Sequence, residues 1–181
     1  LNYHLPEDVS VRSAQHVAAE FDPRRHAVAR EYVYTVNDSA TVSPIGRRFE
    51  AHARDALDVA AMDAAGRGLE GVRDFAAFAG PATPPEASTV RRMDSASAER
   101  TGERVTMTFR ANAFLNQQVR KMAAALVSVG GGALSVEHFG QLVEGATRGA
   151  STGLMPARGL CLARIDYPES GAGKMPAGWR A

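Results

Sequence analysis

The chain has 181 residues, of which 45% are apolar and 23% charged, as is usual for a globular domain with a sizeable core. Its 21 basic residues nearly balance its 20 acidic ones, so net charge alone indicates no class of partner. No run of 18 apolar residues and no signal peptide is present, and we therefore expect a cytoplasmic protein without a membrane span.

Alternation and helical periodicity divide most of the chain into short elements. Alternating apolar residues indicate strands at Asp8–Val17, Arg30–Asp38, Arg47–Ala53, Thr89–Glu99, Arg104–Phe114 and Gly159–Pro168. Helices are predicted at Asp55–Val72, at Phe114–Val129 and after Ser135, with Asp55 and Ser135 as N-caps. Loops are predicted at Phe21–Arg30 and Phe78–Thr89. A Gly/Pro-rich tail occupies residues 169–181.

This order of elements predicts an α+β fold. Strands come in hairpins and helices in blocks, which is typical of an antiparallel β-sheet of roughly four or five strands with helices packed on one face. The other face would be free for a ligand. We expect residues 1–168 to carry the fold.

The helix predicted at Phe114–Val129 has a buried stripe, formed by Leu115, Val119, Met122, Leu126 and Val129. Arg120 lies beside this stripe, and small residues and amides are its expected helical neighbours. A guanidinium against a core either forms a structural buried ion pair or holds a carboxylate or phosphate in a cleft. The sequence leaves both readings open.

Basic residues cluster in the loop predicted at Phe21–Arg30. Arg24, Arg25 and His26, followed by Arg30, place four basic groups in seven residues, which could clamp a nucleic-acid backbone or could form a solvated loop. Nineteen of the 21 basic residues are arginines, and a skewed genome composition would produce the same bias.

Tyr32 and Tyr34 share one face of the strand predicted at Arg30–Asp38. Both could be core residues, or both could form a platform on which a base stacks.

No cofactor or metal motif is present. The five histidines are scattered, and no dinucleotide-binding, P-loop or nucleophile-elbow pattern occurs. Cys161 is the single cysteine and lies in the apolar run "GLCLARI", so we expect a small core residue rather than a nucleophile. Residue chemistry alone thus predicts an α+β domain without a cofactor or metal motif, leaves open whether it binds an anionic, planar ligand, and does not indicate a reaction.

Five segments in order extend this interpretation. "LNYHLPEDVSVRSA", "AREYVYTV", "LEGVRDFAAF", "ANAFLNQQVRKMAAALVSVG" and "ARGLCLARIDYP" together closely resemble the tRNA pseudouridine synthases of the TruA type, from about Leu1 to Pro168. The resemblance implies a homodimeric isomerase without cofactor or metal. Its substrate would be uridine in the anticodon stem-loop of tRNA, typically at positions 38 to 40, flipped out of its helix for the reaction.

The resemblance also assigns roles to residues of this chain. Tyr32 matches the tyrosine that packs on the flipped uracil, and Leu160 matches an apolar residue that lines the uracil pocket. Arg120 matches the arginine that pairs with the catalytic carboxylate and keeps it ionised as a nucleophile. Where the family more often has His or Met before V-R, this chain has "NQQVR".

The family's nucleophilic aspartate lies in a GRTD-x-G segment upstream of "LP-x-D". This chain begins a few residues before "LPED", and none of its nine aspartates follows R-T. We therefore expect the carboxy-terminal portion of such an enzyme, inactive alone, with Arg120 either exposed or paired with a substitute anion. The competing hypothesis is a non-catalytic RNA-binding or oligomerisation module derived from the same fold.

Overall fold

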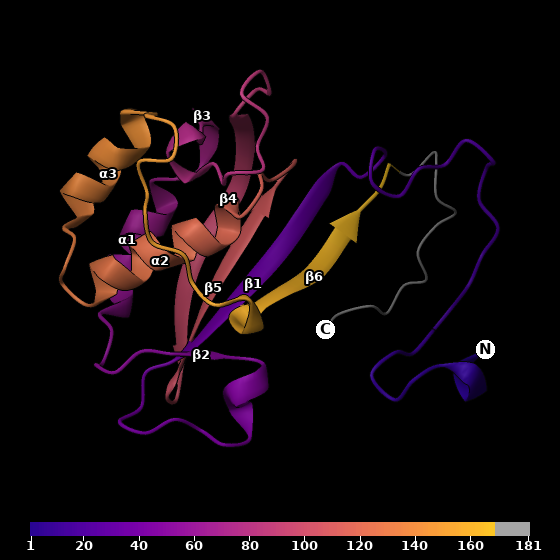
Figure 1. Ribbon diagram of the computed structural model, residues 1–181, viewed down its shortest axis with the longest axis horizontal. Coiled ribbons are helices and arrows are strands. Elements are labelled where there is room, and N and C mark those ends of the chain that lie inside the picture. The colour runs from indigo at the N-terminus through magenta and orange to yellow at the C-terminus, as the bar shows by residue number, and fades with distance from the viewer. Residues whose placement is uncertain (169–181) are drawn as a thin grey trace. The chain divides into compact units, whose positions relative to one another are not determined.

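The computed structural model describes residues 1–168, in two compact units. The larger unit, Val28–Asp166, contains every strand and α-helix of the described chain (Figure 1). The smaller comprises residues 1–27 with Tyr167 and Pro168, and its regular structure is one 3-10 turn, η1 (Asn2–His4). The predicted tail, 169–181, lies outside the described residues.

The larger unit is built on a six-stranded sheet. Its strands are β1 (Ala29–Asn37), β2 (Ala51–His52), β3 (Gly71–Asp74), β4 (Val90–Thr101), β5 (Arg104–Ala111) and β6 (Leu160–Asp166). Their order is β2-β1-β5-β4-β3. Both β6 and β2 pair with the edge of β1 that faces away from β5: β6 pairs with the first part of β1, and β2 pairs with its last two residues. All pairings are antiparallel except the short parallel one between β1 and β2.

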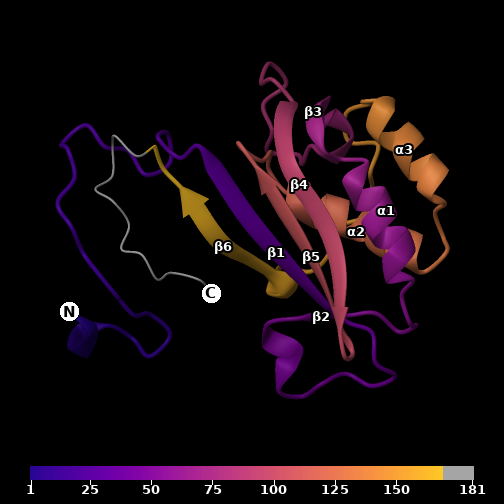
Figure 2. The same cartoon turned by 180° about the vertical axis from the view of Figure 1, so that it is seen from behind.

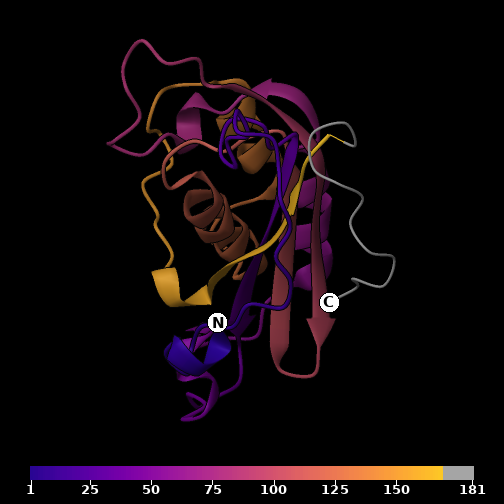
Figure 3. The same ribbon diagram turned by 90° about the vertical axis from the view of Figure 1, so that its right-hand side faces the viewer.

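Helices cover one face of this sheet. They are α1 (Val59–Arg67), α2 (Gln118–Gly130) and α3 (Val136–Glu144), with short 3-10 turns η2 (Gly46–Arg48), η3 (Ala76–Phe78) and η4 (Ala157–Gly159) between other elements. Seen from behind, the long strands lie in front of the helices (Figure 2), and a side view places α2 beside one face of β4 and β5 (Figure 3). The predicted α+β architecture is confirmed, with a mixed sheet in place of a purely antiparallel one.

The core forms where the α2 stripe meets the inward side chains of β1 and β5. Tyr34 of β1 lies opposite Met107 of β5, and both are fully buried. All five residues of the predicted stripe, Leu115, Val119, Met122, Leu126 and Val129, are buried. The period-2 and period-3.6 patterns therefore identified the two layers correctly.

The predicted strand at Asp8–Val17 is wrong. This segment has no regular structure, and its valines are exposed, because no strand of the described chain pairs with it. The side-chain amide of Asn2 donates to the carbonyl of Val11 and accepts a hydrogen bond from its N–H. Alternation without a pairing partner does not produce a strand.

Two predicted helices begin later than expected. The side chain of Asp58, not that of Asp55, accepts a hydrogen bond from the Ala61 N–H and caps α1. The second helix begins at Gln118, because Gln117 adopts a left-handed conformation with a φ of 59°. Phe114–Gln117 therefore lies outside the helix, with a turn at Asn116 and Gln117, and the side chain of the buried Gln118 accepts a hydrogen bond from the Leu115 N–H.

Three smaller expectations need correction. The segment Arg47–Ala53 contains the end of η2 and only two strand residues. The short strand β3 was not predicted, since its four residues lack an apolar pattern. Cys161 is exposed rather than part of the core, because it faces away from the helices on β6. Ser135, in contrast, caps α3 as predicted.

Candidate functional site

Arg120 lies on the first turn of α2 and is half-buried. Its Nε donates a hydrogen bond to the carbonyl oxygen of Met155 at 2.7 Å, and the Met155 N–H donates to the carbonyl of Arg120 at 3.3 Å. No carboxylate of the described residues pairs with it. A neutral carbonyl thus occupies Nε of a partly exposed Arg120, and its pairing with an anion from outside the described residues stays a prediction.

Lys121 is anchored beside it. Its Nζ is buried and donates to the carbonyl of Ser151 at 2.6 Å. Two consecutive cations of α2 thus hold both ends of the segment 151–155, which leads through η4 into β6. Backbone carbonyls accept from both charged side chains, and these bonds hold the connection against α2.

Tyr34 has the core role that the sequence left open. It is fully buried, and its hydroxyl donates to the carbonyl of Pro156 at 2.6 Å. Burial raises the pKa of Tyr34 to about 12, although the positive charges of Arg120 and Arg158 act in the opposite direction. The hydroxyl therefore stays protonated at neutral pH and serves as a hydrogen-bond donor.

Tyr32 differs from Tyr34 in its exposure. It lies on the same face of β1, opposite Phe109, but is only partly buried. Its ring meets the ring of Phe114 edge-on, with centroids 5.2 Å apart and an interplanar angle of 89°. This contact fixes the ring and leaves part of its surface open. Of the two tyrosines, only Tyr32 remains available to a ligand.

Leu160 is the first residue of β6 and lies opposite Tyr34 in the strand pairing. It is partly buried against the core. Tyr34 therefore lies near all three residues to which the family resemblance assigns a role. Leu160 is its partner on β6, Tyr32 is two residues before it on β1, and the positive charge of Arg120 acts to lower the pKa of its hydroxyl. The fold brings a cation, an aromatic ring and an apolar side chain to one region.

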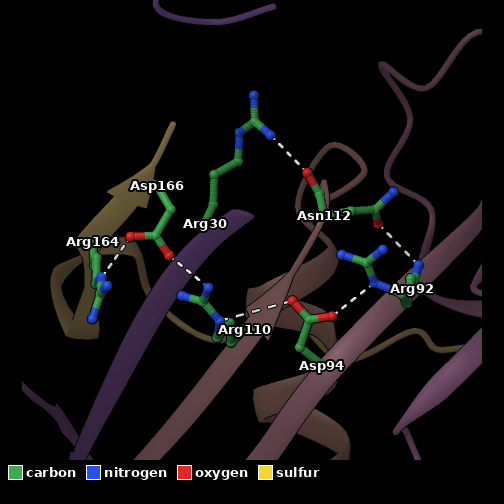
Figure 4. Close-up of polar contacts among 7 residues, drawn as sticks. All are labelled: Arg30, Arg92, Asp94, Arg110, Asn112, Arg164 and Asp166. Carbon is green, nitrogen blue, oxygen red and sulfur yellow. Dashed lines mark hydrogen bonds and ion pairs between the residues drawn. The ribbon is translucent and has the colours of Figure 1, made fainter. Parts of the chain in front are cut away.

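The three arginines proposed for RNA backbone contacts divide between the two units. Arg30 is in β1, and its Nη1 donates to the carbonyl of Asn112 at 2.7 Å (Figure 4). Arg24 and Arg25 are in the smaller unit, where both backbone N–H groups bond to the Asp22 carboxylate. These hydrogen bonds lower the pKa of Asp22, with the bond from the Arg25 N–H having the larger effect and that from Arg24 the next. The ionised Asp22 carboxylate offsets part of the positive charge of this loop.

A row of ion pairs crosses the sheet of the larger unit near Arg30 (Figure 4). Arg164 and Arg110 bind Asp166 at 2.7 and 2.6 Å, and Arg110 and Arg92 bind Asp94 at 3.8 and 2.8 Å. Burial acts to raise the pKa of Asp166, but the two arginines outweigh it and the pKa is lowered. Three arginines alternate with two aspartates here, so the positive charge at this end of the sheet is partly neutralised.

Within residues 1–168, no three histidine, cysteine, aspartate or glutamate side chains gather into a possible metal site. No helix in that range has the length and apolar character needed to cross a membrane.

Comparison with known proteins identifies the family. A family model described as tRNA pseudouridine synthase matches residues 65–168. The tRNA pseudouridine synthase A of Roseiflexus sp. (strain RS-1) is 41% identical over 177 residues, which cover 96% of this chain and 64% of that protein. The namesake from Geobacter sulfurreducens is 39% identical over 171 residues, covering 92% of this chain and 68% of that protein. The chain belongs to the tRNA pseudouridine synthase family.

This chain spans 64% of the length of the Roseiflexus synthase. The matched residues 65–168 include α2 with Arg120 and β6 with Leu160, whereas Tyr32 lies outside the family model and within the longer match to the relatives. The half-buried arginine therefore lies within both the family model's match and the match to the relatives.

Sequence reasoning missed the partners of Arg120 and Lys121. Both partners are backbone carbonyls, 35 and 30 residues away, and a carbonyl has no side-chain signature in the sequence. The sequence shows Gln117 and Gln118 before Val119 and Arg120, but it does not reveal the left-handed turn at Gln117 or the buried amide of Gln118.

Proposed function

We propose that this chain takes part in converting uridine to pseudouridine in tRNA, as the portion of the synthase that binds the uracil and orients the nucleophile. The observation that supports this most directly is Arg120. Its Nε is occupied by Met155, while neither Nη group has a hydrogen bond within the described residues. A half-buried guanidinium with two unused Nη groups can hold a carboxylate by its fork.

The neighbouring side chains suit a pyrimidine. The partly open ring of Tyr32 offers a face or edge to a uracil, and Leu160 provides an apolar wall near it. Arg120 would lower the pKa of a carboxylate brought to its fork, and so keep it ionised for attack on the nucleotide. The glycosidic C–N bond breaks, the base turns, and a C–C bond forms at C5, which releases the C5 proton.

The described residues place no carboxylate at Arg120, so the nucleophile in this proposal comes from outside them. The anticodon stem-loop as the tRNA region, positions 38 to 40 as the targets, and a homodimeric assembly belong to the same proposal. Its rival is a non-catalytic RNA-binding or oligomerisation module, which the missing carboxylate also favours.

Tritium release from tRNA labelled at uridine C5 tests the proposal. We expect no release by the 181-residue chain alone. We expect release when the chain is joined to the part of the Roseiflexus synthase that lies outside the match, with the intact Roseiflexus protein as the positive control. A folded, tRNA-binding chimera that releases no tritium would exclude the catalytic proposal and leave the binding module. Release by the chain alone would show that it supplies its own nucleophile.

A further inference from the structure

Three arginines of the larger unit stand apart from the rest. Within Val28–Asp166, every other arginine donates a side-chain hydrogen bond or forms an ion pair with a described residue. Arg47, Arg48 and Arg54 do neither, and all three are exposed. The neighbouring Glu50 does not neutralise them, because it is buried and paired with Arg104 at 2.8 Å.

The same segment exposes two large apolar side chains. Ile45 is 92% exposed and Phe49 is 78% exposed, on either side of Arg47 and Arg48. Gly46 explains the arrangement, since it is buried against the Glu50 carboxylate, where a Cβ would collide. The turn η2 therefore faces inward with its glycine and outward with its cations and phenyl ring.

This segment adjoins the candidate site. Arg158 of η4 donates to the Glu50 carbonyl at 3.3 Å, and Arg47, Glu50 and Arg158 line one small surface pocket. Since η4 leads directly into Leu160, Arg47 and the turn that carries it lie near the Leu160 end of the proposed uracil pocket. Figure 1 shows η4 and the loop that contains η2 at the same end of the sheet.

We propose that the segment 45–54, here called the arginine loop, binds the RNA next to the flipped nucleotide. Arg47, Arg48 and Arg54 contact phosphates, and Phe49 stacks on a neighbouring unpaired base. Cations without partners beside an exposed aromatic ring are the combination with which proteins hold single-stranded or looped RNA. The inference rests on the proposed function and extends it to a second contact with the substrate.

Charge favours RNA over a second copy of the chain as the occupant. In a two-fold interface built on the arginine loop, the cations of one copy would approach the cations of the other. The one carboxylate of the loop, Glu50, is already paired with Arg104, and the nearest other one in sequence is Asp55, just after the loop. A polyanion meets all three cations at once and releases counterions as it binds.

Binding of unmodified tRNA transcript to the 181-residue chain, measured by fluorescence anisotropy over a range of salt concentrations, tests the inference. We expect Arg47→Ala/Arg48→Ala to weaken affinity at least about tenfold and to reduce the slope of log K against log salt by about 1.5, the share of two phosphate contacts. Arg67→Ala/Arg73→Ala removes equal charge from the α1–β3 side and should change affinity less than twofold.

The aromatic contact has its own variants. We expect Phe49→Ala to weaken affinity at least about fivefold with an unchanged salt slope, and Phe49→Tyr to restore it, because stacking needs a ring rather than a charge. Val72→Ala, which truncates a side chain 71% exposed on β3, is the matched control.

The outcomes separate this inference from the proposed function. Failure of the unmodified chain to bind tRNA would overturn both. Normal binding by the folded arginine-loop variants would overturn the RNA contact and leave the proposed function intact. Loss of self-association in Phe49→Ala during sedimentation, with tRNA affinity unchanged, would assign the loop to an interface between copies instead.

Discussion

Replacing Gly159 by alanine should disturb the candidate site from within its own backbone. Gly159 is the last residue of η4 and is buried against β1. A Cβ built on it would lie 2.7 Å from Cζ of Tyr34 and 2.8 Å from the carbonyl oxygen of Thr35. Neither neighbour can move easily, because Tyr34 is fully buried and Thr35 is held in β1 by its pairing with Thr106 of β5.

The expected cost follows from these contacts. Forcing a methyl group into a packed core costs about 1–3 kcal/mol. Loss of the hydrogen bond from Tyr34 to Pro156 adds about 1 kcal/mol if η4 is pushed away. Alanine also lowers the conformational entropy of the unfolded chain, which stabilises the folded state by about 0.4–1 kcal/mol. This gain applies because Gly159 does not have a positive φ. We expect a net destabilisation of about 2 kcal/mol.

Urea unfolding followed by circular dichroism measures this difference. Gly140→Ala is the matched control, because its Cβ would meet nothing within 4 Å and the residue lies within α3. It should raise the free energy of unfolding by up to about 1 kcal/mol. Equal effects of the two substitutions, or a Gly159→Ala variant as stable as the original protein, would refute the packing argument.

Three further predictions concern the helix start, acid stability and catalysis. Because Gln117 has a φ of 59°, Gln117→Gly should raise the free energy of unfolding by about 0.5 kcal/mol and Gln117→Val should lower it by at least about 1 kcal/mol, as urea unfolding would measure; a destabilising glycine would contradict this. The Arg100 fork lowers the pKa of the buried Asp38, so its contribution is complete above the unfolded pKa of about 3.9 and is lost as pH falls through the lower folded value. The urea concentration at the unfolding midpoint, measured from pH 7 to pH 2, should therefore decrease once the pH is below about 4. Asp38→Asn should make this decrease less steep; an equally steep decrease in the variant would assign the loss of stability to other groups. In the chimera, Arg120→Lys should keep the charge and lose the fork, reducing tritium release at least about tenfold, or roughly 1.4 kcal/mol, with much less effect on tRNA affinity; the reverse pattern would make Arg120 a phosphate contact.

Elements with a strong period and a local partner were predictable. The hairpin of β4 and β5 closes through Gly102, which takes a positive φ of 59° between the two predicted strands. The α2 stripe and the Ser135 cap also follow from local sequence. The segment at Asp8–Val17 alternates equally well but has no partner strand, and pairing is a tertiary property that alternation does not encode.

The candidate site was predictable only in part. The family resemblance singled out Tyr32, Arg120 and Leu160, and the fold then gathered them around Tyr34. The arginine loop was interpreted as a short strand, although "RRF" combines basic and aromatic residues in the way RNA-contacting loops do. Its lack of counterions depends on where every carboxylate lies in space, which no local pattern reveals.

The bonds from Arg120 to Met155 and from Lys121 to Ser151 have a consequence for local opening of the protein. The segment 151–155 cannot detach without breaking contacts to the first turn of α2, so the two should open as one cooperative unit. The Met155 amide, which donates to Arg120, should then exchange its hydrogen at the same rate as the amides of that turn. A nucleotide or carboxylate bound at the Arg120 fork would slow exchange across the whole unit, which makes amide exchange at Met155 a reporter of occupancy some 35 residues along the chain from the arginine.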